Sequence, residues 1–289
     1  MRSLRDLVLV AALASCASHA SPPPPPTLLT FGVDAPESSE SYVCFGFDAR
    51  ALAGRWLRAI RWSPPPEGAV ALHHASLYAS PAPFPDGPTP CDAMPAAWTM
   101  HVWGRGGDAL VLPPDVAIAL AADTQRFIVQ AHVLRTAAGP PAAASVTLDT
   151  TTTAPVHVAA FFGAAAGTPA IRPRTRETST ATCRASTAMH IVSSWPHMHR
   201  LGASFTSTLV RVDGTRATIV DVTPWSFDHQ STYAVDLDVA PGDGVETTCV
   251  WQNDGDAYVL PGLRSSDEMC GQGLVVWPAE AARWDGGCP

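Results

Sequence analysis

The chain has 289 residues, of which 46% are hydrophobic and 15% are charged, and its formal net charge at pH 7 is −8. This length suits one large domain or two domains of ordinary size, each with a substantial core. All 18 basic residues are arginine and no basic run occurs, which argues against a nucleic-acid partner.

The N-terminal segment has the pattern of an export signal followed by a spacer. Arg2 and Arg5 precede an apolar run that is too short to span a bilayer. The sequence LASC, which ends at Cys16, resembles the lipoprotein box of bacteria and implies lipidation of this cysteine; an ordinary signal peptide is the alternative. We expect a signal peptide over residues 1–15 and a stiff proline-rich spacer over residues 16–30. The protein would then be exported to a bacterial cell envelope, in the periplasm or at the outer membrane, and would meet the membrane only through a lipid anchor; if the box is not used, it would be secreted.

The rest of the chain predicts an all-β protein. Short alternating or apolar runs recur between clusters of Pro, Gly and Asp, as is typical of β-sandwiches. In chain order, examples are SYVCFGFD, AVALHHASLY, RFIVQAHVL, ASVTLDTTT, VHVAAFF, AMHIVSSW, FTSTLVRV, ATIVDV, YAVDLDV and GLVVW. The segment DARALAGRWLRAI is ambiguous between helix and strand. A boundary after TLDTTTT predicts two domains, over residues 31–153 and 154–289.

The cysteines favour disulfides. Apart from Cys16, the chain has six cysteines, and an even number in an exported protein favours up to three bridges. Cys44 and Cys91 fall in the first predicted domain and the other four in the second. Pairing within each domain is therefore the simplest arrangement.

Conspicuous histidines occur in three places along the chain. They are His73 and His74, then His132, and then His190 with His197 and His199. Residues i and i+2 of a strand share a face, so the H-x-H pair presents two imidazoles side by side while Met198 between them points away. Adjacent strand residues point to opposite faces. His73 and His74 can therefore share a metal only if the backbone bulges or the two rings use different nitrogens.

A methionine near the C-terminus completes a possible ligand set. Met269 lies in the segment SSDEMC, and a thioether added to two imidazoles favours copper, Cu(I) in particular. In this order, the motifs HH, QxH, HxHxLG and EMC resemble the copper type II, ascorbate-dependent monooxygenases. The segments YVCFGF and GDGVETTCVW are similar to strands of the same family. The resemblance extends over residues 41–289.

The resemblance implies two tandem antiparallel β-sandwich domains, jelly-roll-like, with two copper sites that face an interdomain cleft. The first domain would hold an electron-storing copper and the second an oxygen-activating copper. The implied ligands are His73, His74 and His132 for the first copper, and His197, His199 and Met269 for the second. Gln130 would lie close to the first copper. The implied disulfides are Cys44–Cys91, Cys183–Cys288 and Cys249–Cys270.

The implied activity is hydroxylation of a substrate C–H bond. A one-electron reductant such as ascorbate would reduce both coppers, dioxygen would be activated at the second copper, and the first copper would deliver the second electron. Three protein ligands leave a coordination position open for oxygen. The alternative is a non-catalytic copper-binding or electron-transfer lipoprotein of the same fold. The substrate, a small molecule or a peptide, and the oligomeric state are not readable from the sequence.

The positions at which the peptide-amidating members of the family bind a substrate carboxylate differ here. Trp195 stands where they have an arginine, two residues before the H-x-H pair. Gly271 and Gly273 stand where they have an asparagine and a tyrosine. Without this clamp we expect no amidation of glycine-extended peptides and a more apolar pocket.

The remaining candidates have plainer predicted roles. We expect His190 to support the site or lie in the core, and His157 and His229 to be structural or exposed. His101 falls in WTMHVWGRGG, whose turn signals predict a loop. Glu268 adjoins Met269, but strand alternation directs it away from the metal, which favours a hydrogen-bonding or surface role over that of a catalytic base.

Overall fold

The computed structural model describes residues 25–66, 71–135 and 140–282. The predicted signal peptide, Cys16 and most of the predicted spacer lie outside these ranges. Residues 27–30, which were expected to belong to the spacer, instead begin the first strand and pair with residues 145–148. Within the described ranges, no helix is long and apolar enough to cross a membrane.

Regular structure in the described residues consists of β-strands and two short 3₁₀ helices. The strands are β1 (Thr27–Val33), β2 (Glu40–Asp48), β3 (Trp56–Ser63), β4 (Ala71–Ser80), β5 (Gly87–Pro90), β6 (Trp98–Gly104), β7 (Leu110–Val111), β8 (Val116–Ala119), β9 (Arg126–Leu134), β10 (Ala142–Thr151), β11 (His157–Ala165), β12 (Thr175–Arg184), β13 (Met189–Met198), β14 (Gly202–Val210), β15 (Arg216–Val222), β16 (Tyr233–Val239), β17 (Gly244–Asn253) and β18 (Cys270–Trp277). The helices are η1 (Arg50–Leu52) and η2 (Ala279–Ala282). The all-β prediction is confirmed, and the ambiguous segment after Asp48 resolves into η1 and β3.

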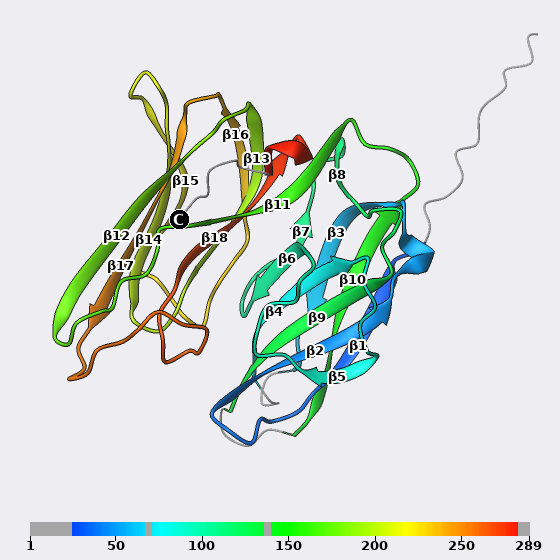
Figure 1. Ribbon diagram of the computed structural model, residues 1–289, viewed down its shortest axis with the longest axis horizontal. Helices are drawn as coiled ribbons and strands as arrows, with labels where there is room; N and C mark the ends of the chain where they lie inside the picture. The colour runs from blue at the N-terminus through cyan, green and yellow to red at the C-terminus, as the bar shows by residue number, and fades with distance from the viewer. Residues whose placement is uncertain (1–24, 67–70, 136–139, 283–289) are drawn as a thin grey trace, which may run out of the picture.

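The strands form three sheets, which are arranged as two halves (Figure 1). A five-stranded sheet, β5-β2-β9-β4-β6, belongs to the N-terminal half, and a four-stranded sheet, β12-β17-β14-β15, to the C-terminal half. The third sheet has nine strands and runs through both halves in the order β1-β10-β3-β8-β11-β18-β13-β16, with β7 beside β3. Its two parts are joined where β8 and β11 pair in parallel. The domain boundary predicted at residue 153 falls between β10 and β11.

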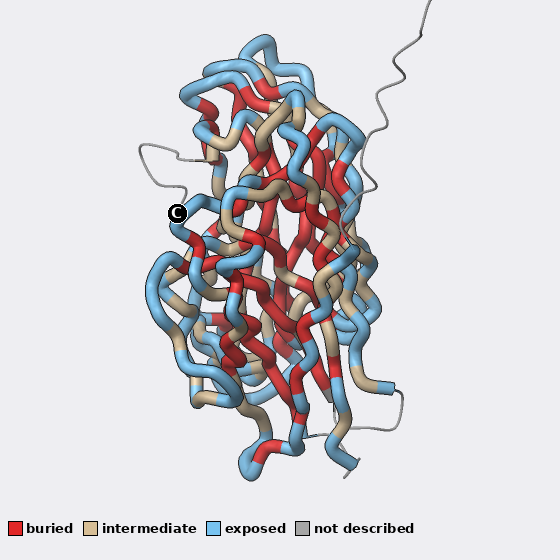
Figure 2. Tube along the Cα trace, turned by 90° about the vertical axis from the view of Figure 1, so that its right-hand side faces the viewer, coloured by how far each residue is buried: buried red, intermediate tan, exposed pale blue. Residues whose placement is uncertain are grey.

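Burial patterns explain which strands lie at the centre of the molecule. β10 alternates between buried and less buried residues, as expected of a strand with one face on a core. β9 and β13 are buried along almost their whole length, so both of their faces are covered. Figure 2 shows this buried material running through the middle of the molecule. Two of the strands that carry predicted ligands, β9 and β13, are therefore central strands.

Two disulfides lie within the described residues. Cys44 is bonded to Cys91 in the N-terminal half, and Cys249 to Cys270 in the C-terminal half. Both pairs are those that the family resemblance implies. In the third implied pair, Cys183 is a buried residue of β12, whereas Cys288 lies outside the described residues. Disulfides of this kind are typical of an extracytoplasmic protein.

Candidate metal centre

A cluster of three histidines lies on two neighbouring strands of the N-terminal half. His73 and His74 come from β4 and His132 from β9, and His74 is the register partner of His132. The register between β4 and β9 shifts between Leu72 and His74. This irregularity is the bulge that adjacent histidines need in order to reach one point. One ring nitrogen from each of the three residues lies within 4.8 Å of the others.

Hydrogen bonds on the far side of the rings orient this cluster. The Nδ1 atom of His74 lies 3.3 Å from Nδ1 of His73 and 3.2 Å from Nδ1 of His132, so the three Nδ1 atoms converge. The Nε2 atom of His73 donates to the backbone carbonyl of Phe227 at 3.0 Å, and that of His132 donates to Glu40 at 2.7 Å. Rings that carry their proton on Nε2 offer a lone pair at Nδ1. The three histidines could therefore hold a metal ion through Nδ1.

The surroundings keep these imidazoles in the neutral form that metal binding requires. Burial lowers the pKa of His73 to about 3, although its bond to Phe227 opposes the shift. Burial and the neighbouring rings of His132 and His73 keep the pKa of His74 well below its usual value. Burial also lowers the pKa of His132, against the effect of Glu40. At neutral pH the three rings are therefore uncharged, and each keeps one lone pair that can bind a metal ion.

The second histidine pair lies at the end of β13. The rings of His197 and His199 are 5.0 Å apart between centroids, while Met198 is fully buried in the core on the other side, as the alternation predicts. The Nδ1 of His197 donates to the side-chain oxygen of Gln230 at 2.8 Å, and that of His199 to the carbonyl of Asp267 at 3.0 Å. This arrangement leaves Nε2 free on both rings. Within the described part of the chain, the Nε2 atom of His199 is buried without a hydrogen-bond partner, as expected of a nitrogen that can bind a metal ion.

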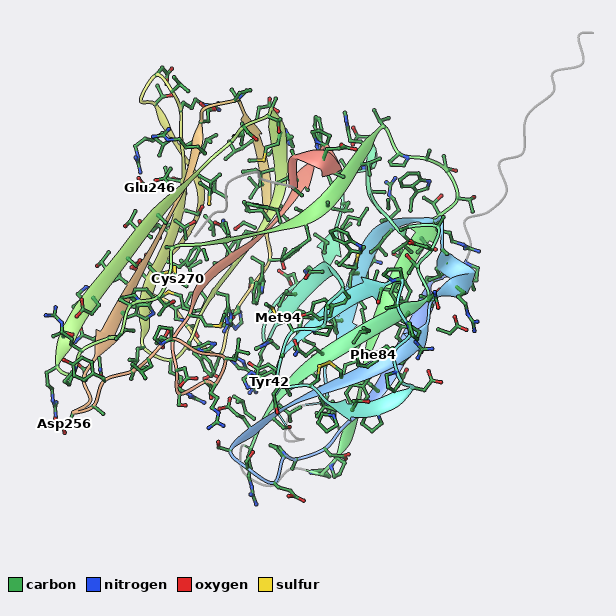
Figure 3. All side chains as sticks on the ribbon, viewed as in Figure 1. Tyr42, Phe84, Met94, Glu246, Asp256 and Cys270 are labelled. Carbon is green, nitrogen blue, oxygen red and sulfur yellow. A yellow bond between two sulfur atoms is a disulfide. The ribbon has the colours of Figure 1, made fainter. Side chains whose placement is uncertain are left out.

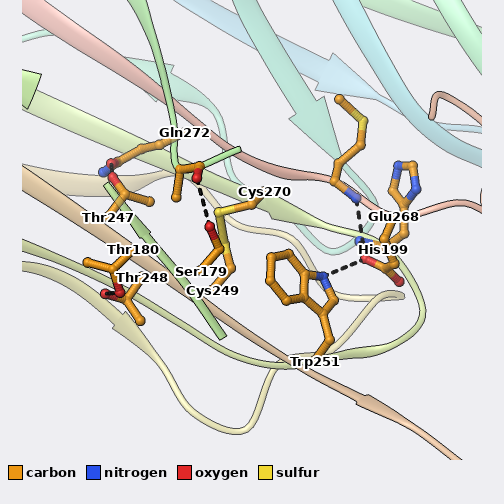
Figure 4. Close-up of a disulfide and its surroundings, with 12 residues drawn as sticks. Ser179, Thr180, His199, Thr247, Thr248, Cys249, Trp251, Glu268, Cys270 and Gln272 are labelled. Atoms are coloured by element: carbon orange, nitrogen blue, oxygen red, sulfur yellow. Dashed lines mark hydrogen bonds between the residues drawn. A yellow bond between two sulfur atoms is a disulfide. The ribbon is translucent and has the colours of Figure 1, made fainter. Parts of the chain in front are cut away.

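Met269 lies between Glu268 and the disulfide residue Cys270, and it lines the same cavity as His74 and His197. Glu268 is 1% exposed, so its predicted surface alternative is wrong and its hydrogen-bonding alternative is confirmed. Its carboxylate accepts hydrogen bonds from the backbone nitrogens of His199 and Leu201. It also accepts one from the indole of Trp251 (Figure 4). Burial raises the pKa of Glu268 against these bonds. Glu268 therefore ties the segment after β13 to the segment that carries Met269.

A chain of hydrogen bonds joins the two groups of histidines. The Phe227 carbonyl that accepts from His73 also accepts from the side-chain nitrogen of Gln230 at 2.9 Å. The other end of the same amide accepts from His197. The rings of His74 and His197 are 5.6 Å apart between centroids. The loop that carries Phe227 and Gln230 therefore orients one ring in each group.

Gln130 lies near the triad but is held by other partners. Its oxygen accepts from the Tyr78 hydroxyl at 3.2 Å, and its nitrogen donates to the carbonyls of Cys91 and Ala93. Gln130 is thus a buried brace between β9 and the segment after the Cys44–Cys91 disulfide. Like His74 and His197, it lines the cavity.

The cavity between the halves has a volume of about 150 Å³. Its walls come from both halves: Tyr42, Met94 and Val102 from the N-terminal half, and Trp195 and Leu263 from the C-terminal half. In Figure 3, Tyr42 and Met94 lie on the side of the N-terminal half that faces the C-terminal half. The Tyr42 hydroxyl donates to the carbonyl of Leu263 at 2.6 Å, which closes one side of this space.

The other histidines lie away from this space or serve as packing residues. His101 belongs to β6 and is 2% exposed, so the predicted loop position is wrong; it accepts from Trp62 and contacts Thr232. His190 is neither in the core nor beside the proposed ligands: its ring nitrogens lie 3.1 Å and 2.7 Å from the carboxylates of Asp236 and Asp238. His157 stacks on Trp277, and His229 is exposed.

Several residues of the site carry no motif. Glu40 begins β2, and Phe227 and Gln230 belong to a loop between β15 and β16. In the sequence, a single glutamate and the segment WSFDHQ resemble many surface positions, so neither one points to a functional site. Their roles arise from contacts over 33 to 154 residues of chain.

Comparison with known proteins gives one family match. Residues 159–283 match the family model of the copper type II ascorbate-dependent monooxygenase C-terminal domain. His197, His199 and Met269 fall inside the matched region, while the three histidines of the N-terminal half fall outside it. No curated protein matches the chain.

Solved structures resemble the chain only weakly. The major capsid protein P2 of bacteriophage PM2 is 8% identical with a TM-score of 0.36, over 86% of this chain and 96% of that one. A putative secreted protein from Parabacteroides distasonis is 6% identical with a TM-score of 0.22, over 86% and 88% of the two chains. Such scores carry no argument about fold or function. The family match does carry one: residues 159–283 match the model of the copper type II ascorbate-dependent monooxygenase C-terminal domain.

Proposed function

We propose that the protein is a copper-dependent monooxygenase that hydroxylates a C–H bond. The overall reaction takes R–H, dioxygen, two electrons and two protons to R–OH and water, with the electrons from an external one-electron reductant such as ascorbate. The observation that carries this proposal is the pairing of two histidine groups across one cavity, with the ring nitrogens that face away held by hydrogen bonds. The matched C-terminal domain supports it independently.

The first copper would be held by Nδ1 of His73, His74 and His132. All three nitrogens are imidazole ligands, which suit copper, and no soft ligand joins them in the proposed set. Hydrogen bonds to Phe227 and Glu40 fix the tautomers of His73 and His132. Phe227 and Glu40 would act as outer-shell residues, which orient metal ligands and raise their basicity.

The second copper would be held by Nε2 of His197 and His199 together with the sulfur of Met269. A thioether favours Cu(I), and three protein ligands leave a position open. Bound copper would supply one-electron chemistry and the activation of dioxygen. The protein contributes the orientation of the rings through Gln230 and Asp267, and it positions Met269 beside the Cys249–Cys270 disulfide.

In this proposal the two halves correspond to two β-sandwich domains of 31–153 and 154–289, and the cavity between them is the cleft between the copper sites. The walls from both halves and the contact between Tyr42 and Leu263 support this arrangement. Exclusion of bulk water from such a space protects a reactive intermediate from side reactions.

The proposal is tested by copper content and oxygen uptake. The purified protein should bind two coppers per chain and consume oxygen in the presence of ascorbate and a panel of small C–H substrates. The change Met269→Ala should lower substrate-dependent oxygen uptake by more than about 100-fold while copper remains bound at the triad. Met198→Leu is the matched control, because Met198 faces the core, and it should keep both coppers and full activity.

Several results would contradict the proposal. A single copper per chain would overturn the two-site arrangement. Full activity in Met269→Ala would remove that residue from the site. Two bound coppers without oxygen uptake on any substrate would favour a copper-binding or electron-transfer protein.

The lipid anchor at Cys16 is a separate proposal. It is supported by the lipoprotein-like sequence before Cys16 and by the disulfides, which point to an extracytoplasmic location. Mass spectrometry of the mature N-terminal peptide should find a diacylglycerol adduct on this cysteine. A mature N-terminus without the adduct would contradict the anchor.

A further inference from the structure

We infer that the substrate is a small, uncharged molecule with an apolar body about the size of one aromatic ring and one hydrogen-bond acceptor, which accepts from the indole nitrogen of Trp195. This inference rests on the proposed function, whose substrate it describes. It is carried by the volume of the cavity, by the absence of charge on its described walls and by an unpaired donor beside the second histidine pair.

The volume and the walls set the size and polarity of the guest. The cavity has a volume of about 150 Å³ and is partly open to solvent, so it has room for a group about the size of benzene. Phe161, Trp195, Val102 and Leu263 supply much of its lining. Gly273 lies opposite Trp195 in the β13–β18 register, and a Cβ atom there would come within 2.4 Å of the Phe161 ring. The glycine therefore admits Phe161 as an apolar wall.

The described walls offer no partner for a charged substrate. None of the described residues that line the cavity is an aspartate, glutamate or arginine, and the chain contains no lysine. An ion in this space would lose its hydration without gaining a counter-charge from a side chain. Copper at the two sites would add positive charge, which disfavours a cationic substrate further.

Several polar groups on the walls are already engaged. The Tyr42 hydroxyl donates to Leu263, and the Tyr78 hydroxyl donates to Gln130. The amide nitrogen of Gln130 donates to two backbone carbonyls. These groups are not available to recognise a ligand without breaking bonds within the protein.

The indole nitrogen of Trp195 differs from these hydrogen-bonded groups on the cavity wall. The residue lines the cavity and is 8% exposed, and among the described residues its Nε1 atom, which is buried, has no hydrogen-bond partner. A buried donor without a partner is costly and rare in native proteins, so it calls for an acceptor that completes it. The Trp195 ring stacks on His197 at 4.9 Å between centroids and at an angle of 14°. A substrate held by this donor would lie next to a proposed ligand of the oxygen-activating copper.

The test is a binding measurement with four probes of similar size. Copper-loaded protein, reduced and free of oxygen so that no turnover occurs, is titrated calorimetrically with acetophenone, ethylbenzene, benzoate and protonated phenethylamine. Acetophenone should bind tightest, ethylbenzene about tenfold more weakly for want of an acceptor, and the two ions more weakly than either. Tighter binding of benzoate or phenethylamine than of acetophenone would overturn the inference.

Two variants separate the donor from the apolar wall. Trp195→Phe keeps a stacking ring but removes the N–H. The affinity for acetophenone should therefore fall about tenfold, to that for ethylbenzene, while the affinity for ethylbenzene changes by less than about twofold. Retained binding of ethylbenzene also shows that the cavity is intact. Phe161→Leu should weaken both neutral probes by a similar factor. Equal loss of both probes in Trp195→Phe, or no loss of either, would contradict the role of the donor. If this variant does not fold, the ranking of the four probes on the unaltered protein still decides.

This experiment can fail independently of the proposed function. Binding of acetophenone through Trp195 without ascorbate-dependent oxygen uptake would overturn the monooxygenase but leave the ligand class in place. Oxygen uptake that depends on an amine or a carboxylate, and on no neutral compound, would overturn the substrate class and leave the monooxygenase in place.

Discussion

At the scale of single residues, the position of one proton on each ring distinguishes the two histidine groups. His73 and His132 donate from Nε2, so their lone pair is on Nδ1. His197 and His199 donate from Nδ1, so their lone pair is on Nε2. The acceptors are two backbone carbonyls, one carboxylate and one amide oxygen. Gln230 provides the one uncharged side chain among these four acceptors. It accepts directly from His197, and it is connected to His73 through the Phe227 carbonyl.

Replacement of Gln230 should therefore weaken the second copper site. In Gln230→Ala, His197 loses the acceptor that fixes its tautomer, and we expect the copper affinity of this site to fall by about 10–100-fold. The first site should change less, because the Phe227 carbonyl remains. Competition with a copper chelator measures both affinities. Gln125→Ala, at an exposed glutamine, is the control; equal affinities in the two variants would contradict the role of Gln230.

At the scale of elements, β6 connects two different sheets and also contacts the C-terminal half. His101 of β6 accepts from Trp62 of β3, which belongs to the other sheet, and contacts Thr232 of the C-terminal half. Both partners are uncharged, and burial lowers the pKa of His101 to about 3. The unfolded chain would bind a proton at a pKa of about 6.5, whereas the folded protein does not. His101 therefore costs stability as the pH falls from about 6.5 towards 3.

The change His101→Asn should reduce this acid sensitivity. Asparagine keeps an acceptor for Trp62 but does not titrate, so between pH 7.5 and 5 the variant should lose about 2 kcal/mol less unfolding free energy than the unaltered protein. Guanidinium denaturation at the two pH values measures the difference, and the contributions of the other histidines cancel. His229→Asn, at an exposed histidine, should behave like the unaltered protein. An identical pH dependence for His101→Asn would contradict the prediction.

At the scale of the whole molecule, the halves are connected by the nine-stranded sheet and by contacts at the metal centre. Glu40 accepts from His132 and also from the backbone nitrogen of Ser265, at 3.0 Å, in the C-terminal half. Burial raises the pKa of Glu40, but the bonds from Ser265 and His132 outweigh it and hold the pKa below its usual value. The carboxylate is thus ionised at neutral pH and links His132, a proposed metal ligand, to the opposite half.

Removal of this charge should weaken the proposed first copper site. Glu40→Gln keeps an acceptor for Ser265 but no longer has a negative charge opposite His132, and we expect the copper affinity of the triad to fall by about 10–100-fold. Chelator competition gives the affinity, and circular dichroism shows that the fold is kept. The exposed Glu37→Gln is the matched control. If both variants bind copper equally, Glu40 does not support the triad.

Much of the local structure could be predicted because it depends on backbone periodicity. Alternation along β13 places His197 and Trp195 on one face and Met198 in the core, and the same rule requires the irregularity that β4 shows at His73 and His74. The turn signals around His101 were misleading, because the pairing of β6 with β4 outweighed local propensity.

The sequence by itself determined the all-β class, the grouping of the histidines and the residue types suited to copper. Only the tertiary structure decided which nitrogen of each ring is free and which residues hold the others. It also decided that Trp195 Nε1 has no partner among the residues that the structure describes. These properties depend on contacts such as His132 with Glu40 and His73 with Phe227, which are 92 and 154 residues apart. Strand periodicity acts over neighbouring residues, whereas the meeting of distant loops depends on the order of the strands in the sheets and on the packing of the two halves.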